Sequence, residues 1–163
     1  HLPGTPYLTG TPLAHDEMNA LLEMGERPAG PRPTVYTTTE PCPLCMGAAR
    51  MAGVGEVVFA SRDAWAGCSA MAESVPYLMR SGPTAAGPLT GLEFPLIAWQ
   101  VSVFAKIYIT PPFFDAWRSY APHAYRCGME LSERGTLGQL AAGGAGVEEV
   151  WGVLLQSLEH HAP

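Results

Sequence analysis

Two short motifs made of metal-ligand residue types constrain this chain more than any other feature. His15-Asp16-Glu17 comes first, and Pro41-Cys42-Pro43-Leu44-Cys45 follows it. Two cysteines three positions apart at the beginning of a helix direct their sulfur atoms to one side, and the positive end of the helix dipole favours the thiolate form that a metal requires. We therefore expect a fold that brings His15 beside this cysteine pair.

The number of candidate ligands indicates what kind of metal site this is. His15, Cys42 and Cys45 offer one nitrogen and two sulfur atoms, and three protein ligands leave one position of a tetrahedral zinc ion open, as in catalytic sites. Zinc lowers the pKa of water in that position to about 7, so that a nucleophile is available at neutral pH. Glu17 is assigned to proton transfer and not to the metal. The motifs predict a catalytic zinc centre.

Two other interpretations of the cysteine pair remain open. A Cys-x-x-Cys pair also occurs as half of a structural zinc site and as a redox pair. A structural site needs a fourth ligand, for which Cys68 and Cys127 are candidates, although neither has a second ligand residue at the usual close spacing. With such a ligand the chain would be a non-catalytic, zinc-stabilised interaction module.

Composition limits the partners of the chain. Its 163 residues are the usual size of one domain, and 47% of them are hydrophobic, which is enough to form a core without disulfides. The net charge of −6 and the absence of any run of Lys or Arg argue against nucleic acid and favour a small substrate. No apolar run is long enough to span a membrane. The spacing of the cysteines implies a reducing compartment, so we expect a soluble, cytoplasmic protein.

The first half of the chain shows clear periodic patterns. Apolar residues at helical spacing predict a helix from Leu13 that ends at Gly25, with His15 and Glu17 in its first turn. A strand, a helix that opens at Pro41 and a second strand are expected next, and this order predicts a parallel strand–helix–strand unit. The three elements are placed at 34–38, 41–53 and 56–61.

The second half is less regular. A short helical pattern covers 69–80, and two further helices are predicted at 112–120 and 147–160. The apolar segment from Val101 to Ile109 is interpreted as a strand, with a buried helix as the alternative, because periodicity does not separate the two for a short apolar run.

The motifs and their surroundings resemble the cytidine-deaminase-like superfamily, in particular the branch of tRNA adenosine deaminases, guanine deaminases and fungal-type cytosine deaminases. The resemblance extends over 14–21, 35–48 and 54–62, and Asp16 replaces the usual Ala between the His and the Glu. It implies a three-layer α/β/α sandwich with a mixed sheet. Fourteen residues precede His15, so we expect the family's N-terminal helix and first two strands to be missing, to lie upstream of His1, or to be replaced by another segment.

The resemblance also implies an activity: zinc-dependent hydrolytic deamination of a nucleobase, nucleoside or related aminated heterocycle, with release of ammonia. We expect one deaminase domain over 1–163, with the zinc-site core in 1–67 and an atypical part in 68–163. Asp63 and Trp65 are candidate substrate contacts, the latter because an indole can stack on a ring. A homo-oligomer, with a dimer favoured, is expected from the relatives. A nucleic-acid-editing deaminase is the alternative, since it would use the same four residues.

Overall fold

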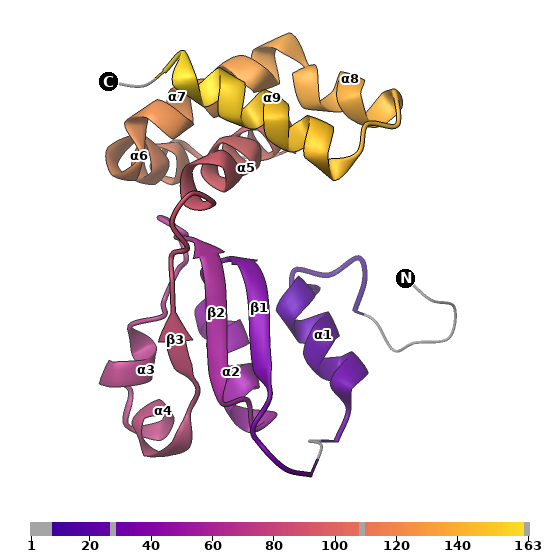
Figure 1. Ribbon diagram of the computed structural model, residues 1–163. Coiled ribbons are helices and arrows are strands. Elements are labelled where there is room, and N and C mark those ends of the chain that lie inside the picture. Colours follow the sequence, from indigo (N-terminus) through magenta and orange to yellow (C-terminus); the bar gives the residue numbers. More distant parts are fainter. Residues whose placement is uncertain (1–7, 27–28, 108–109, 162–163) are drawn as a thin grey trace. The chain divides into compact units, whose positions relative to one another are not determined.

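A computed structural model describes residues 8–26, 29–107 and 110–161 (Figure 1). The protein is mixed α/β and mostly helical, with a small three-stranded sheet, so the predicted α/β class is confirmed. The chain forms two compact units, His1–Pro88 and Leu89–Pro163, and each is described by itself. The boundary that the sequence indicated at residue 67 lies inside the first unit, and a single deaminase domain over the whole chain stays a prediction.

The first unit contains the sheet and the predicted parallel strand–helix–strand arrangement. Strand β1 pairs with β2, and β2 pairs with β3, all in parallel. The expected mixed sheet is thus wrong for the described strands, because helices connect each of them to the next and such crossovers join parallel neighbours. The elements are α1 (Asp16–Met24), β1 (Thr34–Thr39), α2 (Pro43–Met51), β2 (Glu56–Ser61), α3 (Met71–Ser74), α4 (Pro76–Ser81) and β3 (Thr84–Ala86).

The core of this unit lies between the sheet and one layer of helices. α2 lies behind β1 and β2 in Figure 1 and contacts α1, α3 and α4. Apolar side chains from these elements form one buried cluster: Leu21, Met46, Ala49, Val54, Val57 and Leu78. On β1 exposed and half-buried residues alternate, and Tyr36, on the outward face, is 77% exposed. Among the described residues of this unit, the helices thus form one layer of the expected sandwich.

Helix α2 begins two residues later than the sequence predicted. Pro43, and not Pro41, occupies the first helical positions, and Cys42 is the N-cap residue with an extended backbone. A proline suits this place because it has no N–H to leave unpaired and its φ is already helical. The consequence is that Cys42 stands just before the helix and Cys45 in its first turn.

The second unit is a set of helices. It consists of α5 (Glu93–Ile107), α6 (Pro111–Tyr120), α7 (Pro122–Arg134), α8 (Thr136–Ala142) and α9 (Val147–Glu159). The predictions for α6 and α9 are confirmed, whereas α7 and α8 were not predicted. The helical pattern at 69–80 becomes the two helices α3 and α4. None of the helices that the structure describes is long and apolar enough to cross a membrane.

The predicted strand at 101–109 is wrong, because its described part belongs to helix α5. Ile97, Ala98 and Val101 are fully buried on this helix, at the spacing of one helical face. α5 packs most extensively on α7, and Gly128 permits the close approach, since a Cβ atom there would lie 2.5 Å from the Ala98 carbonyl oxygen. Residues 108 and 109 lie outside the described part of the chain.

Two methionines on α2 test this packing. Met46 is fully buried in the core cluster, whereas Met51 is 80% exposed on the same helix. Met46→Ala is expected to lower the free energy of unfolding by about 2–5 kcal/mol, because it leaves a cavity. Met51→Ala should change it by less than about 0.5 kcal/mol. Urea unfolding followed by circular dichroism measures both, and equal effects would contradict the assigned face of α2.

Candidate metal centre

The three predicted ligands lie together. The Nδ1 atom of His15 is 3.5 Å from the Sγ atom of Cys42 and 3.4 Å from that of Cys45, and the two sulfur atoms are 3.7 Å apart. A tetrahedral zinc ion with ordinary bond lengths places two sulfur ligands about 3.8 Å apart and a nitrogen and a sulfur ligand about 3.6 Å apart. The donor set and its spacing therefore fit zinc.

Helix beginnings hold these ligands in place. His15 is the N-cap residue of α1, and Cys42 is the N-cap residue of α2. Both have extended backbone conformations, and their carbonyl oxygens accept the first helical hydrogen bonds, from Asn19 N–H and Met46 N–H. Since α1 and α2 contact each other, the ligands meet where two helices begin.

A buried amide anchors the segment before the site. Asn19, on α1, is buried and forms two hydrogen bonds to the backbone of Leu8: its Oδ1 atom accepts from the N–H, and its Nδ2 atom donates to the carbonyl oxygen. Asn19 thus joins helix α1 to a segment eleven residues earlier.

Glu17 lies beside the ligands without belonging to their group. The described residues that can share one metal ion are His15, Cys42 and Cys45. One carboxylate oxygen of Glu17, Oε2, is 3.4 Å from the Cys45 sulfur, and the other, Oε1, accepts a hydrogen bond of 2.6 Å from the Thr37 hydroxyl. A carboxylate so close to the ligands can accept protons from, and donate protons to, molecules held at the centre.

The electrostatics at Cys45 differ from the expectation based on the helix dipole. Burial raises the pKa of the Cys45 thiol well above its ordinary value, and the neighbouring Glu17 carboxylate and Cys42 raise it further. A divalent cation, when bound, would offset these effects, because a thiol that coordinates a metal loses its proton.

Neither of the other two cysteines completes the metal site. Burial raises the pKa of Cys68 to about 12, and its thiol donates to the carbonyl oxygen of Pro41, 3.2 Å away. Cys127 is fully buried on α7, where burial raises its pKa to about 11. Both are free, protonated thiols at neutral pH. The four-ligand structural site considered from the sequence thus receives no support from the described residues.

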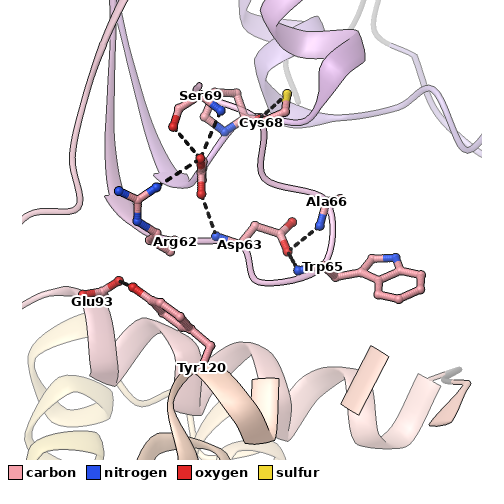
Figure 2. A network of polar contacts seen from close by, with 10 residues as sticks. Arg62, Asp63, Trp65, Ala66, Cys68, Ser69, Glu93 and Tyr120 are labelled. Carbon is pink, nitrogen blue, oxygen red and sulfur yellow. Dashed lines mark hydrogen bonds and ion pairs between the residues drawn. The ribbon is translucent and has the colours of Figure 1, made fainter. Parts of the chain in front are cut away.

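A buried carboxylate organises the loop beyond β2. Glu40 is only 6% exposed and stands directly before the Pro41-Cys42 pair. Its Oε1 atom accepts hydrogen bonds from the backbone N–H and the hydroxyl of Ser69 and lies 3.5 Å from the Arg62 guanidinium, while its Oε2 atom lies 3.4 Å from the Asp63 N–H (Figure 2). Glu40 therefore binds both ends of the loop that contains Trp65.

The two candidate substrate contacts lie on this loop. The Oδ1 atom of Asp63 accepts hydrogen bonds of 2.8 Å from Trp65 N–H and 3.0 Å from Ala66 N–H, which form a tight turn (Figure 2). Burial raises the pKa of Asp63, and these two hydrogen bonds oppose the rise. Trp65 is 53% exposed at the tip of the turn. The structure thus gives Asp63 a role in shaping the loop.

Sequence reasoning missed the contributions of Glu40 and Thr37. A charged residue between a half-buried strand and a proline–cysteine pair was a signal for Glu40, because a carboxylate is seldom buried without partners. Thr37 follows from the alternation on β1, whose inward residues are Val35, Thr37 and Thr39. The partner of Thr37 depends on how α1 packs, and the partners of Glu40 depend on how the loop after β2 folds back, and neither is determined by local sequence.

Comparison with known families agrees with this geometry. Residues 5–61 match the family described as the cytidine and deoxycytidylate deaminase zinc-binding region. The matched segment contains His15, Glu17, Cys42 and Cys45, so the whole candidate metal centre lies within the part of the chain that is similar to this family. No curated protein and no solved structure matches the chain.

Zinc content tests the three-ligand site. His15→Ala and Cys45→Ser are expected to reduce bound zinc from about one ion per chain to a small fraction, because each removes one of three ligands. Cys68→Ser and Cys127→Ser are the matched controls and should keep the full content. Mass spectrometry of the metal in dialysed protein measures the zinc content of each variant. Loss of zinc from the Cys68 variant would indicate a closed, structural site.

Proposed function

We propose that this chain, whose residues 5–61 are similar to the zinc-binding region of cytidine and deoxycytidylate deaminases, is a zinc-dependent hydrolytic deaminase of an aminated nucleobase, nucleoside or related heterocycle. One observation supports the proposal above all others. The three ligand atoms of His15, Cys42 and Cys45 converge at zinc-like distances, and the Glu17 carboxylate lies directly beside them.

In this proposal His15, Cys42 and Cys45 hold the metal, and Glu17 transfers protons. Zinc, when bound, acts as a Lewis acid and lowers the pKa of a water molecule to about 7. Glu17 accepts a proton from the attacking water and gives it to the ring nitrogen of the substrate. The water oxygen bonds to the ring carbon, and Glu17 then moves the remaining proton of this new hydroxyl to the amino group. The carbon–nitrogen bond breaks, ammonia leaves, and a carbonyl group remains on the ring.

The loop after β2 supplies the proposed substrate contacts. Trp65 is half-exposed at its tip and offers an indole face on which an aromatic ring can stack. Asp63 uses its Oδ1 atom to hold the turn, so its Oδ2 atom is the one that would contact a polar group of the substrate. Glu40 holds the loop through its hydrogen bond with Ser69 and thereby limits how far Asp63 and Trp65 can move.

The charge and the cysteines of the chain bear on its partners and its location. A small substrate is supported by the net charge of −6, which would repel the phosphate groups of a nucleic acid. Water is the second substrate. A cytoplasmic location is supported by the four cysteines, which form no disulfide and would persist reduced in such a compartment. A homo-oligomer, with a dimer favoured, is carried over from the family resemblance.

Glu17 provides the direct test of the activity. Zinc-loaded protein is expected to release ammonia from at least one member of a panel of cytosine, adenine, guanine and their nucleosides. Glu17→Gln should lower kcat for that substrate by about 10²–10⁴-fold, because it removes general acid–base catalysis, while the zinc content stays unchanged.

Glu23→Gln is the matched control, since this glutamate is exposed on the same helix. It should retain the activity of the unaltered protein. Absence of ammonia from the whole panel with fully zinc-loaded protein would contradict the proposed substrate class. An unchanged rate in the Glu17 variant would contradict the assigned proton carrier.

Trp65 tests the proposed stacking. Trp65→Ala should raise KM by about three- to tenfold with a smaller effect on kcat, because aromatic stacking contributes about 0.5–1.5 kcal/mol. Trp65→Phe should retain most of the affinity. Trp99→Ala, which removes a comparably exposed tryptophan from α5, is the control, and steady-state ammonia kinetics measure all three. An unchanged KM in the alanine variant would exclude this residue from the substrate site.

A further inference from the structure

A hydroxyl on the inward face of β1 forms a hydrogen bond with Glu17, the predicted proton carrier. Thr37 lies near the middle of β1, and its Oγ1 atom donates to Oε1 of Glu17 over 2.6 Å. This is the usual length of a hydrogen bond from a hydroxyl to a carboxylate, about 2.5–2.7 Å, and such bonds are about twice as strong as those between neutral groups. Within the described part of the chain, the other polar contact of the Glu17 carboxylate is with Cys45.

The strand itself sets the direction of this hydroxyl. The backbone N–H of Thr39 lies 3.4 Å from Thr37 Oγ1 and approaches it as a donor, which leaves the hydroxyl hydrogen for an acceptor. Two acceptors are within reach: the Thr39 carbonyl oxygen at 3.1 Å and the Glu17 carboxylate at 2.6 Å. One hydrogen serves one acceptor well, and the carboxylate is both closer and the stronger acceptor.

Fixing one oxygen of Glu17 determines where the other one lies. A glutamate side chain has three rotatable bonds, and ordering a side chain of this kind costs about 1.5–2 kcal/mol. With Oε1 held by β1, Oε2 lies 3.4 Å from the Cys45 sulfur, beside the metal ligands. A proton carrier is efficient only when its acceptor atom is held within hydrogen-bond reach of the reacting group.

We propose that Thr37 is a positioning residue, whose hydroxyl holds Oε1 of Glu17 so that Oε2 remains directed toward the metal centre and carries the protons. This inference deepens the proposed function and rests on it. Thr37 itself does not touch the reacting atoms. The strand thus contributes to catalysis through the orientation of a residue that belongs to helix α1.

Three variants test this role. Thr37→Val has nearly the same shape and the same preference for strands but lacks the hydroxyl, whereas Thr37→Ser keeps the hydroxyl. Thr34→Val, at the exposed beginning of β1, is the matched control. Thr37→Val is expected to lower kcat by about ten- to a hundredfold, with KM within about twofold and an unchanged zinc content. Thr37→Ser should have a kcat within about threefold of that of the unaltered protein. Thr34→Val should have the same kcat as the unaltered protein.

A structural readout separates this inference from the proposed function. Crystal structures of zinc-loaded unaltered protein and Thr37→Val should show the Glu17 carboxylate in place in the first and displaced in the second. An undisplaced carboxylate in the valine variant would overturn the inference, whatever the substrate. Unchanged kcat in Thr37→Val, or a serine variant as slow as the valine variant, would also overturn it. Failure of the unaltered protein to release ammonia from the panel would count against the proposed function alone.

Discussion

The parallel pairing of β1 with β2 is the interaction on which the candidate site depends. Thr39 is paired with Ser61, and the hydrogen bond from Glu40 N–H to the Ser61 carbonyl extends the pairing by one residue. The chain leaves both strands at the same edge of the sheet, where ligand sites of parallel sheets commonly form. One exit leads into Pro41-Cys42 and helix α2, and the other leads into the loop of Asp63 and Trp65. The register thus sets the metal ligands beside the loop.

The parts of the site that local sequence determines were predicted from it. His15, Cys42 and Cys45 were identified from residue type and spacing, and the structure brings their donor atoms to within 3.7 Å of one another. The strand at 56–61 was predicted at its observed bounds, because a β-branched and aromatic run between turn residues is a local signal. The shift of the helix start to Pro43 is small but places Cys42 at the N-cap.

The parts that depend on contacts distant in sequence were not predicted. The segment around Val101 is apolar on several sides, and its helical form is stabilised by packing against α7, which lies later in the chain. The partnership of Thr37 with Glu17 and that of Glu40 with Ser69 span 20 and 29 residues. A strand pattern shows which residues face inward, but not which side chains they contact. Tertiary packing supplies that information.

The glycine at position 67 has a further consequence for the loop. A Cβ atom there would overlap the Oε2 atom of Glu40 and lie 2.6 Å from the Asp63 carbonyl oxygen. The glycine at position 67 and the long carboxylate side chain at position 40 are therefore sterically complementary. Chains descended from a common ancestor with this one should vary at these positions together: an alanine at 67 requires a shorter residue at 40 and a differently shaped loop. The shape of this loop is thereby restricted, because its base can change only by paired replacements at these two positions.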